Sequence, residues 1–407
     1  MRKMKDSGVE WIGEIPEEWS IRKGKTLYKI DTGKLDANHE NPEGKYPFFT
    51  CSMFPKRINE YAFDCEALLV AGNGLIGYTQ YYEGKFNAYQ RTYVLSQFRD
   101  VDPVFLKYYV SNNLVMEVEK KSVGSVIQFI KMGDLQNFNV VIPSKREQKK
   151  ISEYLESKCS KIDAIIARQE EIIEKLKEYK LSVITETVTK GLDPDVEMKD
   201  SGVKWLSDIP VHWKTYRIAN LYDQTSEAGL EELPILTVSI NTGISDRELA
   251  DDEKDRVFVR SEDRTKYKRV RPGDLAYNMM RAWQGAFGAV RVDGMVSPAY
   301  VTCRPKAEAQ IDSRYIEYLF RTPIAIEEMH RYSHGIADFR LRLYWPEFKN
   351  IRLCLPPIEE QREIADFIDK KSMKIDATIE RREQAVAKLQ DYKKSLIYEV
   401  VTGKKEV

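Results

Sequence analysis

Basic and amide side chains of the kind that contact DNA gather in two separate stretches of the chain. Arg, Lys, Asn and Gln carry donors and acceptors that match guanine and adenine edges in the major groove, and Lys and Arg also bind phosphates. The first stretch supplies Asn73, Gln90, Arg91, Ser125, Gln128 and Lys131. The second supplies Arg256, Arg260, Arg264, Lys266, Lys268, Arg269, Arg271, Asn278, Arg281, Gln284, Arg340 and Arg342. Any one of these is more often a solvated surface residue, so the prediction of a DNA contact surface concerns each set as a whole.

Three glycines surround Asn73, in the run Gly72-Asn73-Gly74-Leu75-Ile76-Gly77. Glycine permits close approach of the backbone to another group, and it also permits a tight turn. The sequence favours neither explanation over the other.

Each sequence motif that resembles a catalytic or metal-binding site lacks a required residue or spacing. Gly24-Lys25-Thr26 matches the end of a phosphate-binding loop, but Trp19 stands where the first glycine is required. Pro194–Lys199 imitates a nuclease signature, yet its first acid and its ExK pair are too close together to lie on separate strands. His330 and His334 have helical spacing without an evident third metal ligand. The amino-methyltransferase run N-P-P-[YF] and the G-x-G-x-x-G turn are also absent, so we expect no catalysis and no metal.

Bulk composition describes a globular protein. The 407 residues allow two or three domains, and 42% hydrophobic with 31% charged residues predicts a soluble chain with charged helices. We expect no membrane span, since no apolar run reaches 18 residues, and no secretory signal. Five scattered cysteines indicate free thiols in a reducing cytoplasm. The balance of 64 basic and 64 acidic residues argues mildly against a protein that grips DNA alone.

The chain contains an internal repeat. Residues 4–19 (MKDSGVEWIGEIPEEW) and 198–213 (MKDSGVKWLSDIPVHW) agree at 10 of 16 positions, at an offset of 194. Residues 147–189 and 360–402 agree at 20 of 43 positions, at an offset of 213. The second intervening segment is therefore 19 residues longer, and the two intervening segments share little sequence. Similar segments at both ends of each copy, with different sequences between them, suggest two domains that recognise different sequences.

Two long helices are predicted, each about 45 residues or 65 Å. The first begins after Pro143 with a Ser144-x-x-Glu147 capping box and ends before Gly191. Apolar residues at sevenfold spacing predict a coiled-coil seam, with the polar residues Gln169 and Arg382 at matched positions in it. The seam residues are Ile151, Leu155, Ile162, Ile165, Ile172, Leu176, Tyr179, Val183, Ile364, Ile368, Ile375, Ala385, Leu389, Tyr392 and Leu396. We expect the two helices to pair with each other in antiparallel fashion; pairing of each with a second protein is the alternative.

The segments between the repeats predict compact α+β domains. In segment 20–142 the strand-like runs are 67–71, 78–82, 92–95 and 139–142, with a helix from Pro103 to about Val118. In segment 214–355 they are 276–277, 288–292, 299–303 and 351–355, with a helix from Ser313 to about Met329. The predicted organisation is a first domain (1–143), a helix (144–190), a linker (191–199), a second domain (200–357) and a second helix (358–407).

This layout resembles the specificity subunit of type I restriction–modification enzymes over essentially the whole chain. The resemblance is carried by D-S-G-V-x-W…I-P…W at 6–19 and 200–213, by the Pro-x-x-x-Glu-Gln helix starts at 143–148 and 356–361, and by the two variable domains with matched helices. It implies two target-recognition domains, each reading half of a bipartite DNA site, and helices that set the gap and dock methyltransferase subunits. S-adenosylmethionine, ATP and Mg would belong to partner methyltransferase and restriction subunits.

Two other functions remain open from the residues alone. A coiled-coil scaffold with two protein-binding heads would more often show a contiguous apolar patch than loops of Arg, Asn and Gln. A free-standing nuclease is opposed by the missing metal motif, and loss of all activity in Glu197→Ala would revive it.

Overall fold

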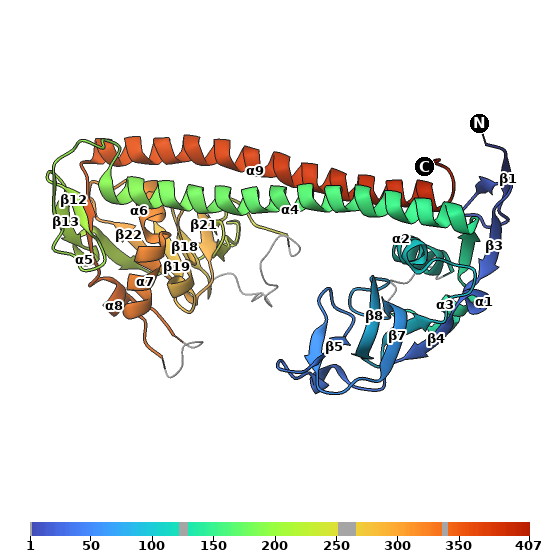
Figure 1. Ribbon diagram of the computed structural model, residues 1–407. Helices are drawn as coiled ribbons and strands as arrows, with labels where there is room; N and C mark the ends of the chain where they lie inside the picture. Colours follow the sequence, from blue (N-terminus) through green and yellow to red (C-terminus); the bar gives the residue numbers. More distant parts are fainter. Residues whose placement is uncertain (1, 122–128, 251–265, 336–340) are drawn as a thin grey trace. The chain divides into compact units, whose positions relative to one another are not determined.

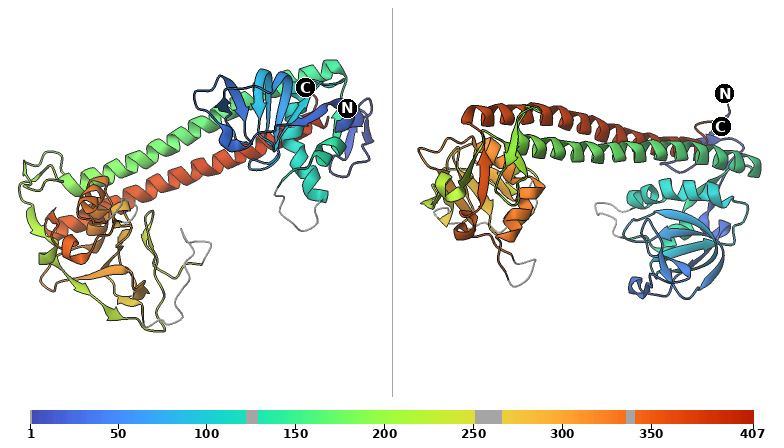
Figure 2. Two further views of the ribbon diagram at one scale, coloured as in Figure 1. Left: turned by 90° about the horizontal axis from the view of Figure 1, so that it is seen from below. Right: turned by 60° about the vertical axis from the view of Figure 1, so that its left-hand side comes forward.

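The chain folds into two compact units. The computed structural model describes residues 2–121, 129–250, 266–335 and 341–407. The first unit combines Met1–Glu171 with Arg382–Val407, and the second unit is Ile172–Arg381 (Figures 1 and 2). The two long helices expected from the sequence, α4 (Lys145–Lys190) and α9 (Ile358–Val401), contribute to both units. Within the described ranges, no helix has the length and apolar content needed to cross a bilayer.

A six-stranded sheet forms the globular part of the first unit. Its strand order is β4-β9-β7-β8-β5-β6, and all neighbours are antiparallel except β5 and β8. The strands are β4 (Lys29–Thr32), β5 (Tyr46–Phe49), β6 (Lys56–Ile58), β7 (Phe63–Ala71), β8 (Thr79–Ala88) and β9 (Thr92–Ser96). Strands β7, β8 and β9 correspond to three of the four runs predicted as strands; the fourth run, 139–142, is β10 (Asn139–Ile142), which lies outside this sheet. The short helices α1 (Gly24–Leu27) and η1 (Ala37–His39) lie between β3 (Ser20–Lys23) and β5 in the chain.

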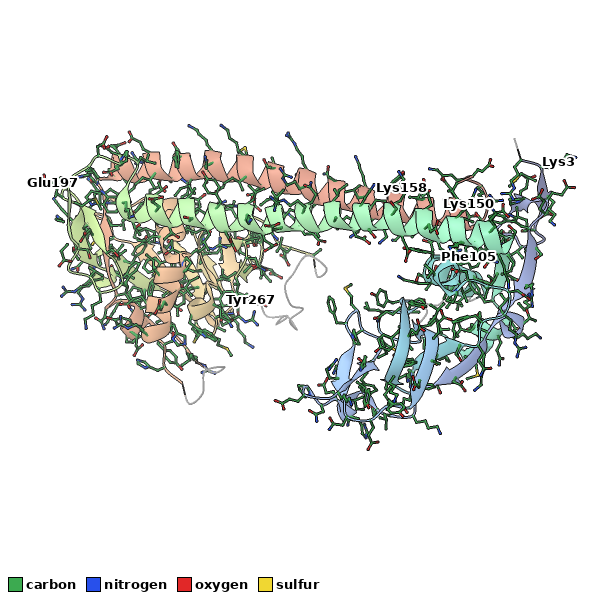
Figure 3. All side chains as sticks on the ribbon, in the orientation of Figure 1. Lys3, Phe105, Lys150, Lys158, Glu197 and Tyr267 are labelled. Atoms are coloured by element: carbon green, nitrogen blue, oxygen red, sulfur yellow. The ribbon has the colours of Figure 1, made fainter. Side chains whose placement is uncertain are left out.

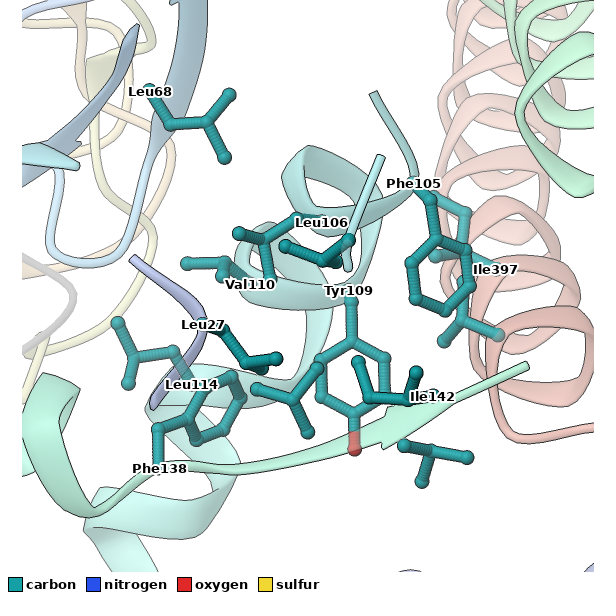
Figure 4. Close-up of a cluster of buried hydrophobic side chains, with 14 of the residues drawn as sticks. Leu27, Leu68, Phe105, Leu106, Tyr109, Val110, Leu114, Phe138, Ile142 and Ile397 are labelled. Carbon is teal, nitrogen blue, oxygen red and sulfur yellow. The ribbon is translucent and has the colours of Figure 1, made fainter. Parts of the chain in front are cut away.

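Helix α2 (Pro103–Lys121) packs between this sheet and the long helices. Phe105 of α2 lies beside Ile397 of α9, and both are buried (Figure 4). Tyr109, on the same face of α2, is fully buried and donates its hydroxyl hydrogen bond to the Asn139 carbonyl oxygen at 3.0 Å. This apolar core joins the globular part to the end of α9, so the first unit is built from both ends of the sequence.

The second unit repeats part of this strand arrangement. Its four-stranded sheet has the order β14-β22-β19-β20, which corresponds to β4-β9-β7-β8 of the first unit, and every neighbouring pair is antiparallel in both units. These strands are β14 (Tyr222–Thr225), β19 (Leu275–Asn278), β20 (Phe287–Ala289) and β22 (Tyr300–Pro305). Additional small sheets are formed by β15 (Glu227–Ala228), β18 (Lys268–Val270) and β21 (Gly294–Val296), and by β16 (Val238–Ser239) and β17 (Gly243–Ile244).

The single helix predicted from Ser313 to about Met329 is two helices, and the prediction is wrong on this point. Helix α6 (Ser313–Phe320) ends at Arg321, and α7 (Pro323–Arg331) begins directly after Thr322. Proline has no backbone N–H and favours the first turn of a helix. The Thr322 hydroxyl accepts a hydrogen bond from the Ala325 backbone N–H at 3.4 Å and caps the new helix.

Matched strand pairs enclose the globular part of each unit. In the first unit these are β1 (Met4–Asp6) with β2 (Glu14–Pro16), and β3 (Ser20–Lys23) with β10 (Asn139–Ile142). In the second unit they are β11 (Met198–Asp200) with β12 (Asp208–Pro210), and β13 (Lys214–Arg217) with β23 (Arg352–Leu355). The remaining short helices are α3 (Met132–Asn137), α5 (Ile218–Leu221), η4 (Ala282–Gln284) and α8 (Trp345–Phe348).

Helices α4 and α9 run antiparallel within each unit, as expected. In the first unit, Asp163 accepts hydrogen bonds from the Lys393 ammonium at 2.6 and 2.7 Å. In the second unit, Lys180 makes the corresponding pair with Asp376 at 2.6 and 2.8 Å. Asp163 and Asp376 are matched positions of the repeat, as are Lys180 and Lys393, so one ion pair occurs twice. Charged side chains such as Lys150 and Lys158 are exposed on α4 (Figure 3).

Four of the fifteen predicted seam residues lie outside the helix contact. Ile165, Tyr179 and Tyr392 are 48%, 48% and 54% exposed, and Ala385 is exposed as well. The helix contact uses Ile173 with Ile375 and Ile379 instead. One residue along a helix turns a side chain by about 100°, which moves it out of the interface. The other predicted seam residues are buried or partly buried: Ile151, Leu155, Ile162, Ile172, Leu176, Val183, Ile364, Ile368, Ile375, Leu389 and Leu396.

Polar residues fix the start and the middle of the helices. The predicted capping box is present, since the Ser144 hydroxyl accepts from the Glu147 N–H and the Glu147 carboxylate accepts from the Ser144 N–H, both at 3.3 Å. Arg382 donates to the Gln169 amide oxygen at 2.6 Å within the first unit. This polar contact lies at the predicted seam positions, where it disfavours other registers.

The Gln of each Pro-x-x-x-Glu-Gln motif joins a long helix to the globular part. Buried Gln148 accepts from the Asp102 N–H (2.6 Å) and donates to the carbonyl oxygens of Asp100 (3.2 Å) and Pro143 (2.9 Å). In the second unit, Gln361 accepts from the Asp312 N–H (2.9 Å) and donates to the Gln310 (3.2 Å) and Pro356 (2.9 Å) carbonyl oxygens. The motif is repeated because the same three backbone groups are satisfied in both units.

The repeated segments 6–19 and 200–213, which we call the two copies of the tryptophan motif, each pack against the end of a long helix. The second copy covers the end of α4, where Val188 is buried with Trp213. The first copy covers the end of α9, where the Tyr398 hydroxyl donates to the Trp11 carbonyl oxygen at 2.8 Å. Gly403, just after α9, has φ +76°, and a Cβ there would lie 2.4 Å from Pro16. This helix end therefore requires glycine.

Candidate nucleic-acid interface

Four loops of the first unit meet at one end of its sheet. We call residues 50–54, 72–77, 89–91 and 129–132 the first loop surface. The Ile130 N–H donates to the Gly72 carbonyl oxygen at 2.8 Å, and the Gly72 N–H donates to the Arg91 carbonyl oxygen at 2.9 Å. The Tyr93 hydroxyl donates to the Ile130 carbonyl oxygen at 2.8 Å. These bonds hold three segments, far apart in sequence, next to one another.

The glycines of this surface have different roles. A Cβ on Gly72 would lie 2.5 Å from the Arg91 carbonyl oxygen, so Gly72 permits close approach between two loops of the protein itself. Gly74 and Gly77 have φ of +63° and +77°, which is the left-handed conformation that a turn requires. Both explanations left open by the sequence are therefore correct, at different glycines.

A hollow of about 280 Å³ opens on this surface. Tyr93, Phe129, Ile130 and Met132 contribute apolar walls, with Gly72, Arg91 and Lys131 completing the lining. Arg91 and Lys131 are exposed, and the Lys131 ammonium lies 5.8 Å from the centre of the Phe129 ring. Within the described residues, neither cation has an acidic partner. Both are therefore available to an anionic ligand.

The remaining first-unit candidates have mixed positions. Asn73 is half-buried beside the hollow, and Gln90 is exposed, with its backbone N–H bound to the Leu35 carbonyl oxygen at 2.9 Å. Ser125 and Gln128 lie outside the described residues. The structure thus brings Asn73, Gln90, Arg91 and Lys131 to one surface.

The second unit builds a corresponding surface. We call residues 278–286, 330–334 and 341–344 the second loop surface. The Leu343 N–H donates to the Met279 carbonyl oxygen at 2.8 Å, which is the counterpart of the bond from Ile130 to Gly72. Arg342 and His334 exchange two backbone hydrogen bonds of 3.0 Å. The Trp283 ring meets the His330 ring edge-on, with centroids 5.6 Å apart.

The loop between β19 and β20 is held by its own polar groups. The Asn278 side-chain oxygen accepts from the Met280 N–H at 3.0 Å, and the Trp283 indole N–H donates to the Met280 carbonyl oxygen at 3.0 Å. Gly285 closes the loop with φ +92°. The tip of the loop is therefore rigid, and it presents Met280, which is 48% exposed, and Arg281.

Comparison with known proteins shows what the chain resembles. The family model described as "Type I restriction modification DNA specificity domain" matches residues 16–178. The EcoDI type I restriction enzyme specificity subunit of Escherichia coli is 32% identical over 234 residues, which cover 53% of this chain and 51% of that protein. The chain is therefore similar to the specificity subunits of type I restriction–modification enzymes over about half of its length. Its aligned part spans about half the length of that relative.

More distant relatives align with nearly the whole chain. The MjaVIII specificity subunit of Methanocaldococcus jannaschii is 23% identical over 424 residues, 96% of this chain and 93% of that protein. A solved structure of "the type I R-M system" aligns with a TM-score of 0.69 at 13% identity over 96% of this chain and 99% of that one. The HsdS subunit from Thermoanaerobacter tengcongensis aligns with a TM-score of 0.50 at 14% identity, over 98% of this chain and 100% of that one. At these identities the solved structures support the fold.

Ion pairing separates the basic residues of the second unit into two groups. Arg269 donates to Asp293 at 3.1 Å, and Arg271 donates to Glu227 at 2.8 Å. Lys268 donates to the Tyr300 carbonyl oxygen at 2.7 Å, and burial lowers the pKa of its ammonium. These three predicted DNA contacts are already engaged, which favours a stabilising role for the run on β18.

Arg304, which was not a sequence candidate, organises that network. It donates twice to Asp274 at 2.8 Å, and Asp274 is buried. Arg304 also donates to Glu227 at 2.5 Å, and this hydrogen bond lowers the pKa of the Glu227 carboxyl. The acidic groups of this part of the second unit are thereby neutralised internally.

The other second-unit candidates lie on the second loop surface or near it. Arg342 has only a 3.5 Å contact with the Tyr344 hydroxyl among the described side chains, and Arg281 has no acidic partner there. Asn278 is partly buried, and Gln284 and Lys266 are exposed. The candidates Arg256, Arg260, Arg264 and Arg340 lie outside the described residues.

Sequence reasoning missed the apolar members of both surfaces. Leu75 and Phe129 are 45% and 46% exposed in the first unit, and Met280 and Tyr344 are 48% and 41% exposed in the second. Two adjacent methionines at 279–280, between a strand and a basic loop, were the available signal. These side chains add apolar contact area beside the free cations.

The dismissed motifs have structural roles. Lys199, at the end of the nuclease-like run, donates to the Val211 and Trp213 carbonyl oxygens at 2.5 and 2.9 Å. His330 contacts Trp283, as described above. No group of three or more His, Cys, Asp or Glu that could hold a metal ion occurs in the described ranges.

Proposed function

We propose that this chain is the DNA-reading subunit of a type I restriction–modification system. The first loop surface reads one half of a bipartite target, and the second loop surface reads the other half. Helices α4 and α9 set the gap and dock methyltransferase subunits. The chain acts in the cytoplasm, an assignment supported by its five unpaired cysteines.

One observation carries this proposal. The same backbone bond, Ile130 to Gly72 and Leu343 to Met279, fixes both loop surfaces on corresponding strands. The side chains presented there differ, with Gly72 and Lys131 in the first unit and Met279 and Tyr344 in the second. A common scaffold with different contact residues is suited to reading two different short sequences.

The chemistry of the two surfaces suits binding and not catalysis. Their unpaired cations can neutralise phosphates and donate to guanine. We infer that methyl transfer from S-adenosylmethionine and ATP- and Mg-dependent steps belong to partner methyltransferase and restriction subunits. The relatives' names, which describe specificity subunits of restriction enzymes, support this division of labour.

Exposed aromatic residues on the helices support the docking of protein partners. Tyr179 and Tyr392 occupy matched positions of the repeat and are both exposed. In the second unit, a groove of about 800 Å³ beside Tyr179 is also lined by Val183, Leu192 and Phe367. We assign this groove to a methyltransferase subunit, because it combines exposed apolar side chains with charged ones, as protein interfaces do.

A segment exchange tests the proposal. The chain is produced with its partner methyltransferase in a host without other methylation, and the methylated motif is found by sequencing. Replacing residues 20–142 with those of another family member should change one half of the motif and preserve the other half and the gap. The matched control replaces residues 214–355 and should change the opposite half. A single contiguous motif, or no methylation by an assembled complex, would contradict the proposal.

A further inference from the structure

We propose that Met280 reads the 5-methyl group of a thymine in the half-site of the second unit. This inference rests on the proposed function and adds a base contact to it. Met280 lies on the rigid loop between β19 and β20 and exposes 48% of its surface. Its neighbours on the second loop surface include the cations Arg281 and Arg342 and the aromatic residue Tyr344.

The first step of the argument is that the loop holds Met280 in place. Its N–H is bound by the Asn278 side chain, and its carbonyl oxygen is bound by the Trp283 indole, each at 3.0 Å. Trp283 in turn contacts His330. The backbone at Met280 is therefore fixed from both sides, and the side chain projects from a preorganised position.

The second step concerns the surroundings of Met280. Arg281 follows it in the chain, and the bond from Leu343 to the Met279 carbonyl oxygen brings the segment of Arg342 and Tyr344 alongside. Within the described part of the second unit, Arg281 and Arg342 have no carboxylate partner, whereas Arg269, Arg271 and Arg304 do. An exposed apolar side chain is thus set among cations that are free to bind phosphate or guanine.

The third step is the chemistry of the ligand. The thymine 5-methyl group is the apolar feature that base edges present in the major groove. A methionine side chain is long and adaptable, and it gains free energy by burying apolar surface. Cations on the same surface would hold the duplex while Met280 contacts this methyl group. The methyl contact distinguishes a T·A pair from a C·G pair at that position.

The experiment uses the full chain with its methyltransferase partner and the target found by the segment exchange. Each thymine of the second half-site is replaced in turn by deoxyuridine, which lacks only the methyl group, and affinity is measured by fluorescence anisotropy. We expect one replacement to weaken binding about four-fold, the value of one buried methyl group. In Met280→Gln this difference between thymine and deoxyuridine should vanish, and in Met280→Leu it should persist.

The matched control is Leu75→Gln, which replaces an exposed apolar side chain of the first loop surface by glutamine. It should preserve the discrimination in the second half-site. A second half-site without thymine, no response to deoxyuridine, or full discrimination in Met280→Gln would each overturn the inference. An equal loss of affinity for both duplexes in Met280→Gln would also overturn it and would indicate a wedge between base pairs. None of these results affects the bipartite motif, the absence of which would instead refute the proposed function.

Discussion

Gly72 in the first unit and Met279 in the second accept corresponding hydrogen bonds from corresponding loops. Around Gly72 the protein forms a hollow with aromatic walls and two free cations at its edge. After Met279 it forms a rigid loop with a projecting methionine. The hydrogen bonds that place the loops come from backbone groups, so they do not depend on which side chains the loops carry. Under the proposed function, such a unit can change its DNA target without changing its fold.

At the borders of the units, by contrast, the contacts made by the long helices are the same in both units. Gln148 and Gln361 bind the same set of three backbone groups, and the ion pair of Asp163 with Lys393 recurs as Asp376 with Lys180. Under the proposed function, in which the helices set the gap, identical geometry is needed in both units. The comparison predicts that substitutions at the borders affect both units in the same way, whereas substitutions in the loops affect one unit.

The largest expected effect is at the buried glutamines. Gln148→Ala and Gln361→Ala should each lower the free energy of unfolding by about 2–4 kcal/mol, because three backbone groups, one buried and two partly buried, lose their partner. The two losses should agree to within about 1 kcal/mol, since matched partners are removed. Urea unfolding of each variant measures this. A large loss in only one variant would show that the two borders are not equivalent.

A smaller effect, on DNA binding, should distinguish a cation without an acidic partner among the described residues from a cation held in an ion pair. Arg91→Ala should weaken DNA binding by the assembled complex and reduce the slope of log affinity against log salt by about 1, since one phosphate contact is lost. Its thermal stability should stay within about 0.5 kcal/mol of the parent chain, as is usual for an exposed residue without partners. The matched variant Arg269→Ala should leave the salt slope unchanged. Equal salt slopes in the two variants would refute this division.

The smallest effect is expected at the repeated ion pair. Lys393→Met and Lys180→Met should each lower stability by less than about 1 kcal/mol, because these pairs are solvated. Double-mutant cycles with Asp163→Asn and Asp376→Asn, followed by urea unfolding, measure the two coupling energies. Coupling energies that differ by more than about 1 kcal/mol would show that the two halves of the helix pair are held differently.

The sequence predicted the elements better than it predicted their contacts. Capping residues and apolar spacing located both ends of α4 and the start of α9 to within one residue, because helix ends depend on local chemistry, whereas α9 ends at Val401, six residues before the predicted end. The seam was displaced at Ile165 and Tyr179, since a charged helix offers several apolar lines at similar spacing and only its partner selects one. The break before Pro323 was recognisable, yet the apolar pattern continued across it.

The candidate interface was predicted in part for a related reason. Loop composition identified Arg91, Lys131, Arg281 and Arg342. It did not separate them from Arg269 and Arg271, whose acidic partners are distant in sequence: Asp293 lies 24 residues and Glu227 lies 44 residues away. Whether a cation is free depends on such tertiary pairs. The apolar residues Met280 and Phe129 were missed because exposure cannot be read from residue type.

The packing of the first tryptophan motif on the end of α9 has a consequence for synthesis on the ribosome. The Tyr398 hydroxyl binds the Trp11 carbonyl oxygen across 387 residues of sequence, and the first unit is completed by Arg382–Val407. The second unit is one continuous stretch, Ile172–Arg381. Although the residues of the second unit emerge later than most of the first unit, the second unit can complete its contacts first, because the first unit also needs Arg382–Val407. The part of the chain that is translated first is therefore the last to close.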